Sequence, residues 1–239
     1  MKNSPEPFTR ESFTEGRVLL LDKPYAWTSF DVVGKVRALL RHVLGVKKPK
    51  VGHAGTLDPL ATGLLVVCTG RMTKSITSYQ DMEKEYTGTM VLGQTTPSYD
   101  LETEPDGTYP HAHITREGAE AAARSLCGCY GQLPPQFSAK KVAGERAYAF
   151  ARRGETTRLE PREVDVREFE ITRFDLPEVD FRISCSKGTY IRALARDFGK
   201  ALGSGAYLKS LRRVRIGQLH VEQAVCPATL EQLLRESAG

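Results

Sequence analysis

Apolar and polar positions in the N-terminal third of the chain predict short strands around one amphipathic helix. Continuous apolar runs or strand-type compositions predict strands over residues 16–24, 63–70 and 85–93. Ser29 is placed to be the N-cap of a helix over about 30–44. One face of that helix is apolar and the other is basic; the apolar positions are Val32, Val33, Val36, Leu39, Leu40 and Val43.

The rest of the chain adds a polar loop, a hairpin and further helices. Residues 94–114 have loop composition, and residues 131–155 are typical of a long basic excursion with a short helix near 145–153. Alternating apolar positions on either side of Leu176-Pro177 predict a hairpin with one buried face. Helices are predicted over about 115–126, 190–202 and 228–236, and a basic strand over 206–216. The pattern therefore indicates mixed α and β structure with several antiparallel pairs.

Composition restricts the class of protein. The chain has 239 residues, 40% of them hydrophobic and 26% charged, which suits a soluble globular protein of one large domain or two small ones. No apolar stretch is long enough to span a bilayer, and the first residues have no apolar signal-peptide region, so we expect a cytoplasmic protein. Five scattered cysteines do not form a disulfide framework and are expected to be small buried thiols.

The net charge of +5 is unevenly distributed. Residues 35–50 contain six Lys or Arg, and residues 198–221 contain five, with no Asp or Glu in either run. Residues 140–153 contain five Lys or Arg and one Glu. Solvated helix faces could explain any one run, but the three together favour a polyanionic partner such as nucleic acid.

An isolated acid, Asp58, stands in the glycine-rich stretch VGHAGTLDPLATG, residues 51–63. Pro59 favours extended geometry for the residue before it, so the Asp58 side chain should project from a loop. Taken alone, these residues leave open a turn that Asp58 caps through its own backbone. A phosphate-binding loop is less well supported, because no Lys-Ser or Lys-Thr pair follows the glycines.

The same stretch resembles the catalytic loop of the TruB-type pseudouridine synthases, whose pattern is close to G-H-x-G-T/A-L-D-P-x-A-x-G. Five more blocks resemble that family in the same order: LLLDKP, KEYTGTMVLG, PPQFSAKKVAGERAYAFARRG, CSKGTYIRALARDFG and GSGAYLKSLRRVRIG. The resemblance covers residues from about 16 to 217. It implies the pseudouridine synthase fold, an α+β architecture whose central mixed, mainly antiparallel sheet is flanked by helices, with an RNA-binding insertion over about 131–155.

The resemblance implies isomerisation of uridine to pseudouridine at position 55 in the T-loop of tRNA, without a cofactor or metal. Asp58 would be the carboxylate that attacks C1′ or takes a proton from C2′, and the residues alone do not choose between these routes. Arg192 would keep Asp58 ionised, since a nearby cation lowers a carboxyl pKa. The Tyr86 ring would stack on the target base, and its hydroxyl would lie near C5.

Other residues would contact the RNA by the same resemblance. His53 would fill the space left by the extruded nucleotide, Leu211 would line the base pocket, and Tyr190 would support it. Asp100 matches the family's loop aspartate, although Pro97 stands where relatives often carry an acid. Lys23 is expected to contact the RNA. Phosphate contacts are expected for Lys74, for the insertion over 134–154 with Lys140, and for the Lys209–Arg215 strand with Arg212. His111 and His113 have no obvious third ligand and are interpreted as surface residues.

We expect one catalytic domain over residues 1–239, too short after Gly217 for a C-terminal PUA-like module, and a monomer that binds the T-arm of tRNA. Two alternatives remain. One is a synthase of the same type acting on another RNA, such as a guide-directed relative, which would be expected to carry that module. The other is a tRNA-binding or tRNA-folding protein without catalysis. A carboxylate-based glycosidase is disfavoured, because no second acid lies near Asp58 in the motifs.

Overall fold

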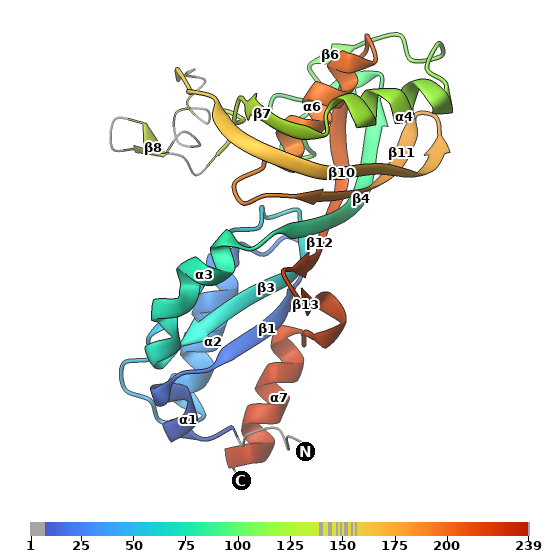
Figure 1. Cartoon of the computed structure of the whole chain (residues 1–239). Helices are drawn as coiled ribbons and strands as arrows, with labels where there is room; N and C mark the ends of the chain where they lie inside the picture. The colour runs from blue at the N-terminus through green and yellow to red at the C-terminus, as the bar shows by residue number, and fades with distance from the viewer. Residues whose placement is uncertain are drawn as a thin grey trace. The chain divides into compact units, whose positions relative to one another are not determined.

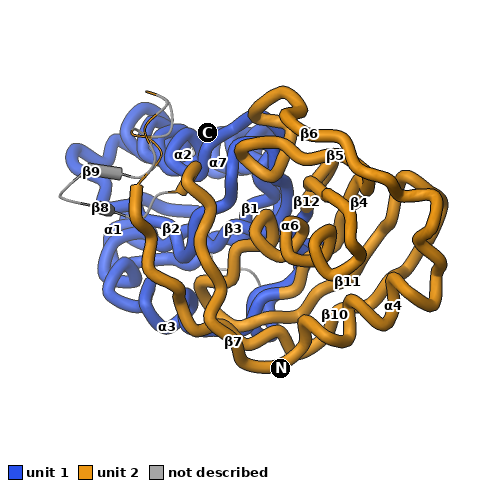
Figure 2. The backbone as a smooth tube through the Cα atoms, turned by 90° about the horizontal axis from the view of Figure 1, so that it is seen from above, with its two compact units in different colours: residues 1–84, 212–239 blue, residues 85–211 orange. Residues whose placement is uncertain are grey.

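The structure is a computed structural model, and it describes residues 8–138, 141–142, 145–146, 148, 150, 153, 155 and 157–238. Its contacts divide the chain into two compact units (Figure 2). Unit 1 contains residues 1–84 and 212–239, and unit 2 contains residues 85–211. The short helix expected near 145–153 falls largely outside the described residues.

Unit 1 is a small sheet with helices packed on both faces (Figure 1). The strands β1 (Val18–Lys23) and β2 (Val51–His53) pair antiparallel with β3 (Thr62–Thr69), and the end of β12 pairs with β3 in parallel. The helices and remaining strand are α1 (Arg10–Glu15), α2 (Ser29–His42), η1 (Gly70–Ser75), α3 (Ile76–Asp81), β13 (Leu219–His220), η2 (Val221–Gln223) and α7 (Pro227–Ala238).

The apolar run of β3 is buried on both faces. Leu65 and Val67 belong to a core cluster with α2 and α7, while Leu64 and Val66 belong to a cluster with α3 and β12. This double burial explains why β3 has no alternating pattern and why its sequence is one continuous apolar run.

Unit 2 is built on a long antiparallel hairpin, as the alternation predicts. The strands β10 (Arg162–Asp175) and β11 (Glu178–Cys185) pair so that Ile171 faces Phe181. Phe169 packs against Phe181 and against Phe198 of α6, with ring centroids 6.2 and 5.2 Å apart. The other elements are β4 (Lys84–Leu92), β5 (Gln94–Thr95), β6 (Gly107–Thr108), α4 (Arg116–Ser125), β7 (Gly128–Gln132), β8 (Lys141–Val142), β9 (Glu145–Arg146), α6 (Ile191–Ala201) and β12 (Ala206–Ile216).

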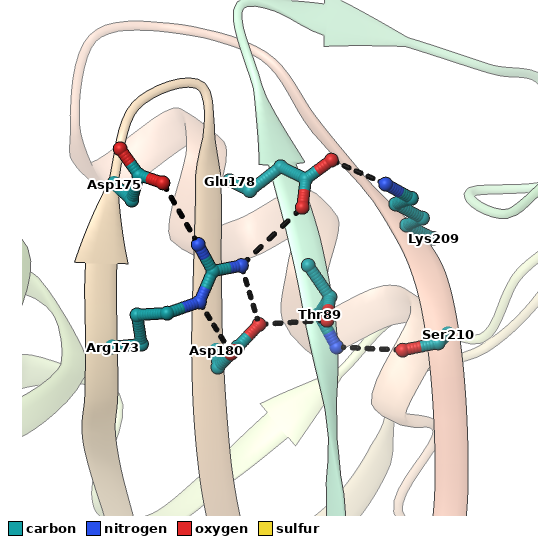
Figure 3. A network of polar contacts seen from close by, with 7 residues as sticks. All are labelled: Thr89, Arg173, Asp175, Glu178, Asp180, Lys209 and Ser210. Atoms are coloured by element: carbon teal, nitrogen blue, oxygen red, sulfur yellow. Dashed lines mark hydrogen bonds and ion pairs between the residues drawn. The ribbon is translucent and has the colours of Figure 1, made fainter.

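The other face of this hairpin is polar and carries a network of ion pairs (Figure 3). Arg173 binds Asp175, Glu178 and Asp180, with nitrogen–oxygen distances of 3.1, 3.3 and 2.7 Å. Thr89 of β4 donates to Asp180 at 2.7 Å, and Lys209 of β12 pairs with Glu178. On β11, Glu178 and Asp180 alternate with the buried Val179 and Phe181. On β10, the register shifts between Ile171 and Arg173, so that Arg173 does not continue the buried series of Phe169 and Ile171.

The hydrogen-bonded order of the large sheet is β1-β3-β12-β4-β11-β10-β7, with β2 on β3 and β13 on β12. The β3–β12 pair is parallel, whereas β1–β3, β10–β11 and β7–β10 are antiparallel. The expected fold class, with a mixed and mainly antiparallel sheet flanked by helices, is confirmed. The polar loop over 94–114 contains only the short β5–β6 pair among its strands.

Gly63 allows β3 and β12 to approach closely. Its φ is +104°, and a Cβ at this position would lie 2.3 Å from the carbonyl oxygen of Arg213. We expect Gly63→Ala to destabilise the chain by about 2–4 kcal/mol, from the steric clash together with the positive φ. Gly45 is the matched control, because its φ is +65° and a Cβ there would meet no atom within 4 Å.

Gly45→Ala should therefore cost only about 1 kcal/mol, the conformational penalty alone. Urea unfolding of both variants and of the parent protein measures how much free energy of unfolding each substitution removes. Equal losses would contradict the close approach of β3 and β12.

Candidate active site

Asp58 lies in the loop between β2 and β3, and buried cations hold the backbone on both sides of it. Arg213 of β12 is 1% exposed. Its Nε donates to the carbonyl oxygen of Leu64 at 2.8 Å, and its Nη2 donates to that of Gly55 at 3.1 Å. The turn after Asp58 is closed by the Ala61 N–H, which donates to the Asp58 carbonyl at 3.1 Å. The Asp58 side chain itself is half-buried.

Lys23, at the end of β1, anchors the loop on the other side of Asp58. Its fully buried ammonium donates to the carbonyl oxygens of Pro24 at 3.0 Å, Trp27 at 2.5 Å and Pro59 at 3.1 Å. Burial lowers the pKa of Lys23 to about 8, and the negative charge of Asp58 acts in the opposite direction. An ammonium has three donors, and carbonyl oxygens of the described chain accept from all three, so the structure gives Lys23 a loop-positioning role. The RNA contact expected of Lys23 stays a prediction.

Ser29 supplies a third anchor, which corrects the expected helix start. Its Oγ accepts from the Leu57 N–H at 2.9 Å and donates to the Leu57 carbonyl at 3.2 Å. The N-cap of α2 is Thr28, whose side chain accepts from the Asp31 N–H at 3.0 Å while Asp31 accepts from the Thr28 N–H at 2.8 Å. This reciprocal capping box satisfies the amides of Thr28 and Asp31, so the cap does not need the Ser29 hydroxyl, which binds the loop instead.

His53 lies in β2, five residues before Asp58, and is mostly buried. Burial and the nearby Arg213 lower its pKa, which favours the neutral imidazole at neutral pH. Among the described residues its Nδ1 has no hydrogen-bond partner. A buried polar atom without a partner is unusual in a folded chain, and it is compatible with a ligand-contacting role.

Arg192, in the first turn of α6, is held by three groups of unit 2 and is 4% exposed. Its Nη1 donates to the Ser98 carbonyl at 3.0 Å, its Nη2 donates to the Phe137 carbonyl at 2.8 Å, and its Nε lies 3.6 Å from Asp100 Oδ2. The guanidinium therefore has a defined orientation, with a buried carboxylate beside it.

Asp100 and Tyr190 are themselves fixed in unit 2. The Asp100 carbonyl accepts from Thr96 Oγ1 at 2.7 Å, and Asp100 Oδ1 accepts from the Glu102 N–H at 3.0 Å. Tyr190 precedes α6, and its backbone N–H and carbonyl both bind the side-chain amide of Gln132, at 2.8 and 3.2 Å.

The other expected site residues lie in varied settings. Tyr86 is in β4 and is 8% exposed, and Leu211 is half-buried in β12. Lys74 is exposed in η1, while Lys140 lies outside the described residues. Unit 1 thus contains Asp58, Lys23, His53, Lys74 and Arg212, and unit 2 contains Tyr86, Asp100, Tyr190, Arg192 and Leu211.

The basic run over 198–221 is not the acid-free surface that the sequence suggests. Arg212 binds Asp22 through two hydrogen bonds of 3.0 and 2.6 Å. Arg215 binds Glu83 at 2.7 Å, and Lys209 pairs with Glu178. The acids come from β1, the segment before β4, and β11, so they are distant in sequence but adjacent in space.

None of the five cysteines forms a disulfide bond, and only Cys68 and Cys185 are buried. The expectation of buried thiols is wrong for Cys127, Cys129 and Cys226, which are exposed. In the described part of the chain, no cluster of three or more His, Cys, Asp or Glu could hold a metal ion. Across the same residues, no helix combines the length and apolar character needed to cross a membrane.

A family model described as TruB family pseudouridylate synthase (N terminal domain) matches residues 41–191. The chain belongs to this family. The tRNA pseudouridine synthase B of Parabacteroides distasonis is 52% identical over 225 residues, which are 94% of this chain and 96% of that relative. The enzyme of the same name from Flavobacterium johnsoniae is 53% identical, and the match covers 95% of this chain and 100% of that relative. The TruB resemblance of the sequence motifs is confirmed.

Solved structures also match the TruB-family fold. A chain in the structure of an H/ACA RNP bound to a substrate RNA containing 2′-deoxyuridine is 25% identical with a TM-score of 0.65. A chain of a Cbf5-Nop10-Gar1 complex is 26% identical, also with a TM-score of 0.65. The matches cover 97% and 98% of this chain but only 59% and 64% of those chains.

Arg213 and Ser29 both anchor the loop that contains Asp58, but the sequence-based prediction gives neither residue a site role of its own. Arg213 follows another arginine in a basic strand, and only the β3–β12 register separates their roles: Arg212 faces Thr62 and Arg213 faces Gly63. Ser29 carries a polar side chain at a helix start, which is equally typical of a cap.

The charge of Lys23 predicts a specific pH dependence of stability. Its pKa is about 8 in the folded chain, against an ordinary value of 10.5, so the unfolded chain binds more protons between these pH values. The free energy of unfolding therefore rises with pH across that window. Lys23→Met has no such titrating group. Between about pH 7.5 and 10.5, the free energy of unfolding of the parent protein should therefore rise by on the order of 2–3 kcal/mol relative to that of Lys23→Met. Urea unfolding of both proteins measures the difference, and parallel pH profiles would rule out this account of Lys23.

Proposed function

We propose that this chain is a tRNA pseudouridine synthase that isomerises uridine 55 in the T-loop. The main support is its likeness to relatives named tRNA pseudouridine synthase B, at 52–54% identity over nine-tenths of the chain or more. The relatives act on tRNA by name, and the motif blocks that resemble the family lie in the same order here.

Asp58 is the catalytic carboxylate of this proposal. Its ionised oxygen either attacks C1′ or removes a proton from C2′, and in both routes the bond between N1 of uracil and C1′ breaks. The uracil then rotates, and C5 bonds to C1′. In the first route this breaks the bond between Asp58 and C1′, and in the second route the proton returns to C2′. N1 takes up a proton as the proton on C5 leaves. The anchors on Gly55, Leu57 and Pro59 fix the backbone around Asp58, which supports a preorganised carboxylate.

Arg192 is the cation assigned to Asp58, and Asp100 orients it. The three contacts that hold the guanidinium favour a single orientation of the group. Tyr86 is assigned to the target base, on which its ring stacks. The proton that leaves C5 would be taken near its hydroxyl.

The partner is the T-arm of tRNA, bound by a cytoplasmic monomer. His53 takes the place of the extruded nucleotide, and its Nδ1, which has no partner among the described residues, supports a contact made only with RNA. Leu211 and Tyr190 line or support the base pocket. Lys74 and Arg212 contact phosphates, and Arg212 would then exchange Asp22 for RNA.

A synthase acting on another RNA is the second candidate, since one matching structure holds an H/ACA RNP with a substrate RNA. That chain is 25% identical, whereas the tRNA pseudouridine synthases B of Parabacteroides distasonis and Flavobacterium johnsoniae are 52% and 53% identical over 94% and 95% of this chain. The tRNA assignment is therefore the better supported one.

Asp58→Asn should lower tritium release from T-arm RNA labelled at uridine C5 by about 1,000-fold or more, because the variant lacks the ionised oxygen. Asp22→Asn is the matched control: it removes a carboxylate of the same unit that binds Arg212, and kcat should stay within about threefold. RNA with cytidine at position 55 should release nothing. Release by Asp58→Asn at the parent rate would exclude the proposed role of Asp58.

Asp100→Asn should lower kcat by about 10- to 100-fold with little change in KM, because a charge-assisted contact to Arg192 contributes about 1.5–3 kcal/mol. Asp106→Asn is the control in the same polar loop, where Asp106 accepts from Thr95 Oγ1 at 2.7 Å. Single-turnover kinetics on tRNA compares the two. If they behave alike, Asp100 does not orient Arg192.

A further inference from the structure

One face of α2 is uncovered, and its residues are suited to binding a ligand. Phe30, Gly34, Arg37 and Arg41 follow one another at helical spacing and share this face, called here the Phe30 face. The Phe30 ring is 67% exposed, and Arg41 is exposed as well. A Cβ built on Gly34 would meet no atom within 4 Å. The opposite face of α2 is buried in the core with α7.

Arg37 holds the exposed ring in place. Its guanidinium carbon lies 5.7 Å from the centroid of the Phe30 ring, and its Nη2 donates to the Val51 carbonyl at 2.7 Å. The cation and the ring attract one another, so the ring has less rotational freedom than an isolated surface phenylalanine. A ring held in this way loses little entropy when a ligand stacks on it.

Three cations on α2 or shortly after its end are not neutralised. Arg41, Lys47 and Lys48 are exposed, and none of them has an acidic partner among the described residues. In the run over 198–221, by contrast, Lys209, Arg212 and Arg215 each pair with an acid. The two runs look alike in sequence, but this one keeps its positive charge available to a polyanion.

The Phe30 face is also connected to the Asp58 loop. Ser29, the residue before Phe30, binds both backbone groups of Leu57, and Arg37 binds the first residue of β2. A ligand on this face would therefore contact the same rigid part of unit 1 that holds the loop.

We propose that the Phe30 face, together with Lys47 and Lys48, binds the tRNA outside the target nucleotide. The Phe30 ring stacks on a base or ribose, and the cations contact phosphates. A ring among cations that lack acidic partners matches the chemistry of RNA, because every base has a stacking face and every linkage carries a charge. The identification of the RNA as tRNA rests on the proposed function. The binding surface itself is inferred from the exposed ring on α2 and from the cations without acidic partners.

The test of stacking compares Phe30→Leu with Phe30→Trp. Phe30→Leu keeps an apolar side chain but loses the ring, and should raise KM for tRNA about tenfold with kcat within about twofold. Phe30→Trp keeps a ring and should restore KM. Leu101→Ala, which alters another exposed apolar residue, is the control and should leave KM unchanged. Running each variant on whole tRNA and on an isolated T-arm stem-loop locates the contact: a change with both substrates places it on the T-arm, and a change with tRNA alone places it elsewhere on the molecule.

The test of the cations measures tRNA affinity against salt in an Asp58→Asn background, so that binding is measured without turnover. Arg41→Gln with Lys48→Gln should lower the slope of log Kd against log salt by about 2. Lys200→Gln with Arg235→Gln is the charge-matched control and should leave the slope unchanged. Lys200 is exposed on another helix, and Arg235 is paired with Glu231.

Unchanged KM and an unchanged salt slope would overturn the proposal. If Phe30→Leu changes the sedimentation coefficient of the protein without RNA but leaves KM unchanged, the face instead binds a second copy of the chain. Failure of the proposed function gives a different result, because the parent protein would then release no tritium while its affinity for RNA could still depend on the Phe30 face.

Discussion

Buried cations hydrogen-bonded to carbonyl oxygens determine the backbone of the Asp58 loop. Lys23 binds the carbonyl of Pro59, and Arg213 binds that of Gly55. A buried ammonium is unfavourable unless polar groups surround it, and here three carbonyls and the charge of Asp58 provide that environment. The loop needs the cation to fix its carbonyls, and the cation needs the loop to remain charged inside the fold. One arrangement therefore sets both the geometry around Asp58 and the electrostatic potential in which its carboxylate lies.

Charge along the sequence and charge in space differ in this molecule. The run over 198–221 contains no acid, yet strand pairing brings Asp22, Glu83 and Glu178 to its cations. The run over 35–50 begins in the middle of α2. Lys35 binds Glu231 at 2.5 Å, and the exposed cations of the run have no acidic partner within the described chain. Antiparallel strands bring together residues that are far apart in sequence, whereas the exposed face of a helix mainly presents its own local sequence. The number of charged residues in a stretch of sequence therefore predicts the unpaired surface charge better for α2 than for β12.

Much of the fold follows from periodicity, and the parts that do not are set by tertiary contacts. The predicted strand over 206–216 coincides with β12, and the predicted hairpin coincides with β10 and β11. The sequence predicts an N-cap at Ser29. A serine hydroxyl at a helix start can either cap the helix or bind a neighbouring segment, and only the position of Leu57 in the fold shows that Ser29 does the latter. The family resemblance assigns Lys23 and the strand that contains Arg213 to RNA, and a local pattern does not reveal that both cations are buried among carbonyl oxygens. The motif identifies Asp58 and Arg192, but the groups that hold them come from distant segments.

Helix α2 joins these observations. Its first residue, Ser29, fixes the loop through Leu57, its second residue is the exposed Phe30, and Arg37 connects that ring to the strand that leads to His53. The apolar side of the helix is buried with α7 and β3, so its polar side cannot shift without disturbing the core. RNA bound on the Phe30 face would thus be placed relative to the Asp58 loop by one helix that is packed into the core. Preorganisation of this kind uses binding energy from remote parts of a substrate to orient its reacting atoms.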